Sequence, residues 1–174
     1  MEIASLTYQY AKRLAEAGRH VPDIVIAGGF SLEDHAFKAL ALGAPYFKAV
    51  GMARAPLTAA MVGRTVGLMI TEDRVPTSLK TYGTQLDELF ILASELQAEL
   101  GKEFKELPAG GIGRYTYLQR VAQGLRQLMC GSRKFALKYL GREDVCALTR
   151  QAADVTGLPY ILEVDAEEVD RILG

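Results

Sequence analysis

A pair of glycines, Gly28 and Gly29, directly follows a short β-branched run, 24–27, and precedes a helix-like segment. Glycines at such a junction carry no Cβ, so backbone N–H groups can approach a phosphate closely. The helix that follows adds N–H donors and a favourable dipole at its N-terminus. Ser31, with an acidic residue three positions later, fits the start of that helix. This junction predicts a phosphate-binding turn.

A second junction of the same kind follows along the chain. Gly51 ends another short apolar run, 46–50, and Arg54 follows closely enough to supply a charged contact to a phosphate. In a (β/α)8 barrel the loops after the seventh and eighth strands form the usual phosphate site. Two such junctions are a more specific signal than either alone. The alternative is that the glycines only allow tight turns and that Arg54 is an exposed arginine in a first helical turn.

The remaining polar residues do not form a convincing catalytic group. Glu33 and Asp34 suit a helix N-terminus, where the dipole favours carboxylates, better than an acid–base pair. His20 and His35 have no nucleophile or carboxylate at a telling spacing and are expected at the surface. The segment 108–115 is rich in glycine, but it lacks a preceding strand and the lysine of a P-loop, so we interpret it as a loop. No catalytic residue is assigned.

The elements around the two junctions follow from hydrophobic spacing. Apolar residues at helical intervals predict a helix over 3–18, and another helix begins near Ser31 and runs to Gly43. That second helix separates two strands, 23–27 and 46–50. The three elements make a βαβ unit, so the strands should be parallel.

After Arg54 the pattern becomes helical. The basic stretch 132–142 is interpreted as a solvated helix face rather than a binding patch. The further predicted elements are helices over 55–70, 83–100, 118–128 and 145–157, a short strand over 160–164 and a final helical turn.

The composition limits the classes of protein to which this chain can belong. The chain has 174 residues, 49% of them hydrophobic, and a net charge of −1, which suits one domain and gives no reason to expect nucleic acid or an anionic membrane. Cys130 and Cys146 have no CxxC spacing or nearby histidines, so we expect buried thiols and no metal site. No export signal or membrane-length apolar run is found, which favours a cytoplasmic protein.

The segment "IAGGFSLEDHAFKALALGA…FKAVGMAR", within residues 24–54, resembles the end of the FMN-binding domain of the glutamate synthase family of TIM-barrel proteins. The stretches "YLQRVAQGLRQLMCG" and "LGREDVCALTRQAADVTGLPY" are similar to the helical tail of its stand-alone members. The resemblance implies an α/β fold. Residues 1–70 would form a partial (β/α)8 barrel, equivalent to helix 6 to helix 8 with two parallel strands. Residues 71–174 would form a mostly helical C-terminal extension.

The resemblance also implies a cofactor site. Gly28, Gly29 and Phe30 would lie in the loop after strand 7, and Gly51 and Met52 would offer backbone donors after strand 8. Ser31 lies where related flavin barrels often have a basic or small polar residue. With Arg54, these residues form the expected site for the FMN phosphate.

Three departures from the family limit what the resemblance implies. Ala27 occupies the place of the acidic or polar residue that commonly precedes the glycine pair. The cysteine cluster that holds an iron–sulfur centre in glutamate synthases is replaced by "MVGRTVGLMI", so no such cluster is expected. A full barrel takes about 250 residues and eight strands. The strands that would hold the flavin ring are missing, so this chain is not expected to be catalytic alone.

Three functions remain open. The first is a glutamate-synthase-like oxidoreductase module that contributes an FMN-phosphate half-site and works with a complementary chain that carries the missing strands. The second is a non-enzymatic structural or interaction protein that self-associates as a homo-oligomer. The third is a small binder of phosphate ligands without a flavin.

Overall fold

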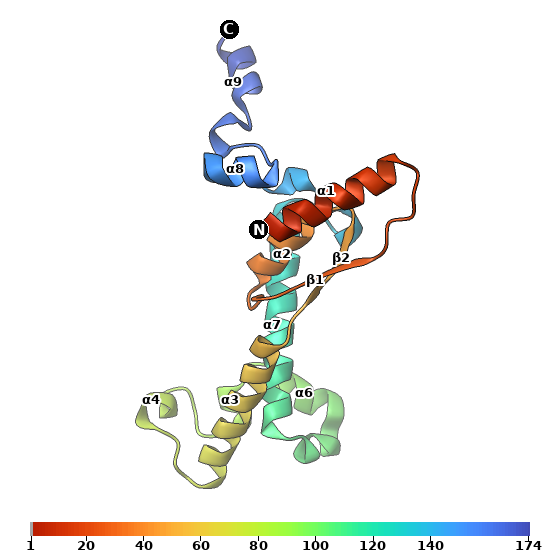
Figure 1. Ribbon diagram of the computed structural model, residues 1–174. Coiled ribbons are helices and arrows are strands. Elements are labelled where there is room, and N and C mark those ends of the chain that lie inside the picture. The colour runs from red at the N-terminus through yellow and green to blue at the C-terminus, as the bar shows by residue number, and fades with distance from the viewer. Residues whose placement is uncertain (1) are drawn as a thin grey trace. The chain divides into compact units, whose positions relative to one another are not determined.

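The computed structural model describes residues 2–174, and these are mostly helical (Figure 1). Two compact units can be distinguished. One comprises the residues up to Gly51 together with Leu125–Gly174, and the other is Met52–Gly124. The division predicted between residues 70 and 71, which is drawn from the resemblance, stays a prediction.

The elements in chain order are α1 (Glu2–Glu16), β1 (Ile24–Ala27), α2 (Glu33–Gly43), β2 (Phe47–Gly51), α3 (Arg54–Thr71), α4 (Thr77–Lys80), α5 (Leu86–Leu89), α6 (Ala93–Leu100), α7 (Ala109–Gly131), α8 (Arg150–Thr156) and α9 (Ala166–Leu173). Short 3-10 helices lie at Gly101–Glu106, Leu137–Tyr139, Arg142–Asp144 and Ile161–Glu163.

The strands β1 and β2 pair in parallel, as their sequences predict. Ala27 is the partner of Gly51, so both strands end at the same edge of the sheet. The helix α2 connects the strands and packs against β2. The side chain of Val25 on β1 is 60% exposed, because only one face of this strand is covered.

The prediction of a partial (β/α)8 barrel is wrong. Among residues 2–174 the sheet has only these two strands, and the other regular elements are helices. A barrel closes by giving each strand a neighbour on both sides, whereas β1 and β2 have only each other. The local sequence pattern therefore correctly indicated a βαβ unit, but no further strand among the described residues pairs with β1 or β2.

The core of the first unit is centred on α2. Phe37, Leu40 and Ala41 lie on one face of this helix and are buried against Met129, near the end of α7, and Leu140. Their spacing follows the helical period, which brings apolar side chains onto a single face. The helix α1 packs against α2. This core holds the βαβ unit without requiring further strands.

Arg142 connects several parts of the first unit. Its guanidinium donates hydrogen bonds to the carbonyl oxygens of Leu42, at 2.6 Å, and Thr156, at 2.5 Å. It also lies over the ring of Tyr8, at 4.2 Å from the ring centroid. The prediction of a solvated helix face over 132–142 is wrong, because this stretch is irregular or 3-10 and its last arginine binds inward.

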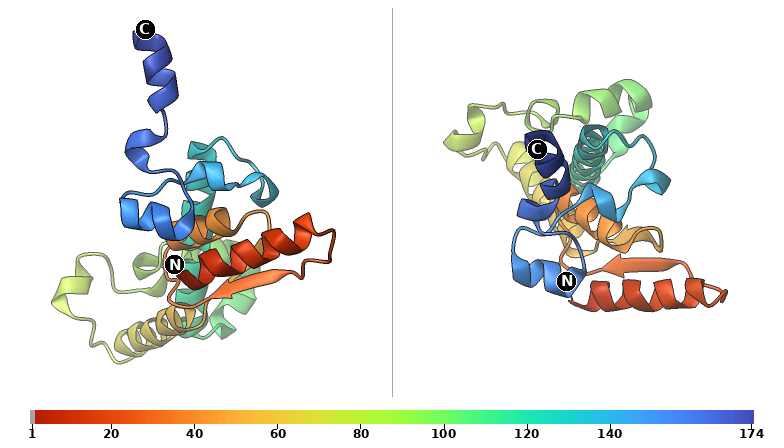
Figure 2. Two further views of the ribbon diagram at one scale, coloured as in Figure 1. Left: turned by 45° about the horizontal axis from the view of Figure 1, so that its top comes forward. Right: turned by 90° about the horizontal axis from the view of Figure 1, so that it is seen from above.

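The second unit depends on close packing between α3 and the first half of α7, which run side by side (Figures 1 and 2). A Cβ added to Gly63 would lie 2.6 Å from the carbonyl oxygen of Ala109. One added to Gly110 would lie 2.8 Å from the carbonyl oxygen of Ala60. Only glycine permits this approach. The interpretation of 108–115 as a loop is therefore wrong, because its glycines pack a helix against a helix.

The helix predicted over 83–100 is divided into α5 and α6. The carboxylate of Glu88 accepts hydrogen bonds from the N–H groups of Thr84, at 2.7 Å, and Gln85, at 3.0 Å, and so caps the start of α5. Ala93 and Leu96 of α6 are buried together with Ile112 of α7. These contacts form the core of the second unit.

The strand predicted over 160–164 is absent. Tyr160 makes a single parallel bridge with Ala147, and Ile161–Glu163 forms a 3-10 helix. An apolar run becomes a strand only where another strand extends beside it, and the segment around Ala147 offers one residue of pairing.

Candidate functional site

The turn between β1 and α2 is an open stretch of backbone. Gly28 has a φ of +121° and Gly29 a φ of +72°, conformations that side chains disfavour. Both glycines are exposed, and no atom lies within 4 Å of the position that a Cβ would occupy on either one. The glycine pair is therefore required for the turn itself, and it leaves space in which a ligand can lie against the backbone.

The N-terminus of α2 adds donors beside this turn. The helix begins at Glu33, and its N-cap residue is Leu32, which provides no side-chain hydrogen bond to the first turn. Ser31 is therefore not the cap that the sequence predicts. The first N–H groups of a helix have no partner within the helix, so an acceptor such as a phosphate oxygen can bind there. In α2 the Asp34 carboxylate competes with such an acceptor, because it already accepts a hydrogen bond from the backbone N–H of His35.

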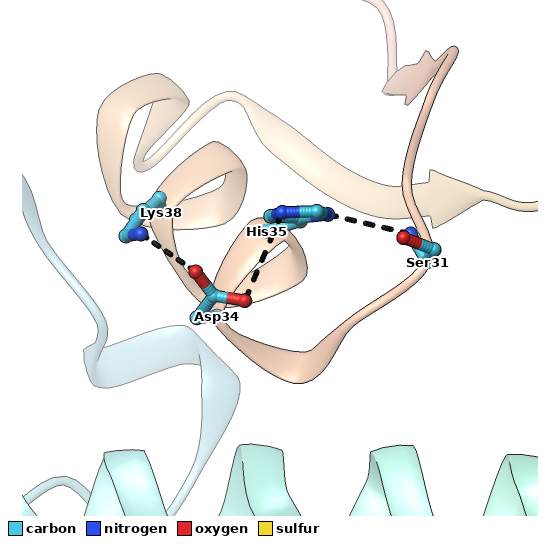
Figure 3. Close-up of polar contacts among 4 residues, drawn as sticks. All are labelled: Ser31, Asp34, His35 and Lys38. Atoms are coloured by element: carbon cyan, nitrogen blue, oxygen red, sulfur yellow. Dashed lines mark hydrogen bonds and ion pairs between the residues drawn. The ribbon is translucent and has the colours of Figure 1, made fainter.

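His35 is part of this site, although its sequence context predicts an ordinary surface residue. The Ser31 N–H donates a hydrogen bond to Nδ1 of His35 at 3.4 Å, which closes the loop onto the first turn of α2 (Figure 3). In this contact Nδ1 is the acceptor, so the proton of the neutral ring lies on Nε2. The signal for this contact was the four-residue spacing between Ser31 and His35.

Charge at the site is mixed. Asp34 accepts a hydrogen bond from Lys38 at 2.6 Å, and its other carboxylate oxygen lies 3.9 Å from Nε2 of His35 (Figure 3). The hydrogen bond from Lys38 is the main cause of the lowered pKa of Asp34. Glu33 also lies in the first turn. The negative charges of Glu33 and Asp34 repel an anion that approaches this turn. The positive charge of Lys38 offsets that of Asp34.

Gly51 lies at the end of the neighbouring strand. A Cβ on Gly51 would lie 3.1 Å from the Cβ of Ala27, so the two strand ends are in direct contact. The structure therefore brings together Gly51 and the turn that starts at Gly28, both in the first unit. Ligands of parallel α/β sheets bind outside the carboxyl ends of the strands, and this is such an edge.

The other residues expected at the site are placed as follows. Phe30 and Ser31 are half-buried within the turn. Met52 belongs to the second unit, where its sulfur accepts a hydrogen bond from the hydroxyl of Tyr117 at 3.7 Å. Arg54 is the exposed first residue of α3. A role for Met52 and Arg54 in phosphate binding stays a prediction.

Other places in the described chain offer less chemistry. Among residues 2–174, no three His, Cys, Asp or Glu side chains are grouped closely enough to hold a metal ion. Cys130 is exposed, contrary to the predicted burial, and Cys146 is half-buried. A shallow hollow of about 490 Å³ lies between α1 and α8, away from the glycine turn, with Glu2, Thr149 and Gln151 in its lining. Within the same residues, no helix combines the length and apolar composition needed to cross a membrane.

No family model, curated protein or solved structure matches this chain. The resemblance to the glutamate synthase family therefore rests on the quoted residues alone.

Proposed function

We propose that this chain is a glutamate-synthase-like module that binds the phosphate of FMN at the turn between β1 and α2 and is not catalytic alone. The observation that carries the proposal is the backbone of Gly28 and Gly29, two successive residues with positive φ at the end of a parallel strand. The adjoining strand end at Gly51 supports it, and so does the N-terminus of α2, where the N-cap residue Leu32 provides no side-chain hydrogen bond.

The proposal includes a partner. Positioning and electrostatic tuning of a flavin ring require a surrounding protein surface, and the described residues provide an edge of two strands rather than an enclosed pocket. We therefore propose that a complementary chain completes the flavin site. We also propose a cytoplasmic location, which is supported by the unpaired thiols of Cys130 and Cys146.

The test is a titration of FMN with the full chain, followed by flavin fluorescence. Riboflavin, which has the same ring and no phosphate, is the matched ligand, and inorganic phosphate is the competitor. We expect saturable binding of FMN, weaker binding of riboflavin and displacement of FMN by phosphate. Equal binding of FMN and riboflavin, or no change in FMN fluorescence, would contradict the phosphate site.

A pair of variants separates binding from folding. Gly29→Ala introduces a Cβ at a φ of +72°, and Gly18→Ala does the same at a φ of +65° after α1. Both changes should lower stability by about 1 kcal/mol, because both place a side chain in the left-handed region. Only Gly29→Ala should weaken FMN binding. Equal affinity in the two variants would place the ligand elsewhere.

A second candidate function is a non-enzymatic protein that self-associates. It is favoured by exposed apolar side chains on several elements, for example Leu57 and Met61 on α3, which are 60% and 61% exposed. This candidate predicts oligomers in the absence of ligand and no response to FMN.

The third function, a general binder of phosphate ligands, has a different test. It is favoured if simple phosphomonoesters raise the thermal stability of the chain as much as FMN does.

A further inference from the structure

The C-terminal helix α9 has an apolar face without a cover. Val169, Ile172 and Leu173 lie on one side of this helix and are 45%, 71% and 80% exposed. Every residue over 161–174 is exposed. In Figure 1 and in the left view of Figure 2, α9 extends away from α8 rather than lying against it.

A helix as short as α9 needs a partner for this face. It has eight residues, and helices shorter than about 12–15 residues are marginal in water unless tertiary packing buries an amphipathic face. The strong separation of apolar and charged residues in α9 is the pattern of a helix that packs. Its stability therefore depends on a surface that covers Val169, Ile172 and Leu173.

The rim of this apolar face is acidic. At 100° per residue, Glu168 and Asp170 lie on either side of Val169, whereas Glu167 points to the opposite side of the helix. Arg171 also lies on the far side and pairs with Glu168 at 3.3 Å. The surface that covers α9 should therefore be apolar at its centre and basic at its edges.

A surface of that kind is present in the segment 133–139, which we call the aromatic loop. Phe135 is 80% exposed and Tyr139 57% exposed. Arg133 and Lys138 are exposed beside them, and the Lys138 ammonium lies 4.9 Å from the centroid of the Tyr139 ring. The aromatic loop thus combines uncovered aromatic rings with positive charge.

We infer that α9 of one copy docks on the aromatic loop of a second copy, reciprocally, to form a closed dimer. Apolar residues would be buried at the centre, and Glu168 and Asp170 would face Arg133 and Lys138. Charge complementarity of this kind fixes the register of an interface and excludes wrong partners. Reciprocal docking satisfies both surfaces of both copies, so the assembly closes instead of forming a filament. This inference does not depend on FMN binding.

The test exchanges the charges between two variants of the full chain. One variant carries Arg133→Glu and Lys138→Glu, and the other carries Glu168→Lys and Asp170→Lys. Sedimentation velocity measures association of each variant alone and of an equimolar mixture. We expect the wild-type chain to be dimeric and each variant alone to dimerise at least about tenfold more weakly, because like charges face each other. The mixture should recover the dimer, since each interface then joins opposite charges.

The same experiment can overturn the inference. A wild-type chain that stays monomeric at about 100 μM, dimers unaffected by either variant, or a mixture that stays monomeric would each exclude this docking. Asp170→Lys alone is compared with Glu167→Lys, which makes the same change in charge on the opposite side of α9. Asp170→Lys should weaken the dimer, whereas Glu167→Lys should leave it unchanged. Far-UV circular dichroism checks that each variant remains folded.

Discussion

Arg142 shows how one side chain can organise a small unit. Its hydrogen bonds reach the carbonyl oxygens near the ends of two helices, Leu42 in α2 and Thr156 in α8. Carbonyl groups in the last turn of a helix have no partner within the helix, and a positive charge there also interacts favourably with the dipole. Arg142 therefore stabilises two helix ends at once.

Replacement of this arginine should destabilise the protein. In Arg142→Met the side chain keeps much of its apolar length, but both carbonyl groups lose a charged donor. We expect a loss of about 2–3 kcal/mol in the free energy of unfolding, measured by urea denaturation. Arg126→Met, at an exposed position on α7, is the control and should change the free energy by less than about 0.5 kcal/mol. Equal effects would show that Arg142 acts only as surface charge.

At the scale of elements, the packing of α3 against α7 is set by where the glycines lie. Gly110 faces the backbone of α3, whereas the adjacent Gly111 is exposed, and a Cβ there would be 3.6 Å from Pro108, an ordinary contact. Two neighbouring glycines in one helix therefore have different structural roles.

Alanine substitutions at these two glycines should have opposite effects. Gly110→Ala forces a Cβ against the carbonyl oxygen of Ala60, and we expect a loss of about 1–3 kcal/mol from overpacking. Gly111→Ala meets no obstacle and should gain about 0.5–1 kcal/mol, because alanine favours the helix. Thermal and urea denaturation measure both changes. A loss at Gly111 as large as that at Gly110 would refute the close approach of the two helices.

The sequence predicted those elements that depend on local signals. The strands β1 and β2 and the helix α2 follow from runs of apolar residues and the glycines that end them. The helical start of α7 was missed, because glycine disfavours helices on its own and only the contact with α3 explains Gly110 and Gly113. Tertiary packing decided against local propensity there.

In the candidate site, too, the sequence predicted the features that depend on local signals and not those that depend on contacts. The positive φ of Gly28 and Gly29 agrees with a sharp turn after a strand. The contact between Ser31 and His35 was not expected. Their four-residue spacing is consistent with it, but spacing alone does not show which amide the histidine ring will face. The inward position of Arg142 was not predicted either, because its partners Leu42 and Thr156 lie 100 and 14 residues away in the sequence.

At the scale of the whole molecule, stability should depend on pH at both ends of the range. The N–H groups of Thr84 and Gln85 lower the pKa of Glu88 below its ordinary value of 4.5. Its stabilising effect is complete above pH 4.5 and is lost as the pH falls through the lowered pKa. The hydrogen bond to Glu143 raises the pKa of Lys134 above 10.5, so that contribution is complete below pH 10.5 and is lost as the pH rises through the raised pKa.

The midpoint of urea denaturation, measured from about pH 2 to 12, checks this expectation. In the wild-type chain the midpoint should be highest between the acid range, where Glu88 becomes protonated, and the alkaline range, where Lys134 loses its proton. Glu88→Gln removes the carboxylate, so it should flatten the decline on the acid side and leave the decline on the alkaline side intact. An acid decline that is unchanged in Glu88→Gln would assign it to other carboxyl groups.

One helix, α7, contributes to both compact units. Ile112, near its start, lies in the core of the second unit, and Met129, near its end, lies in the core of the first. A break in the chain at residue 124, where the two units meet in sequence, would cut this helix and leave each core without a complete support. We therefore expect that neither unit can be transferred to another protein by itself. Chimaeras made from this chain should keep α7 whole, with their boundaries outside this helix.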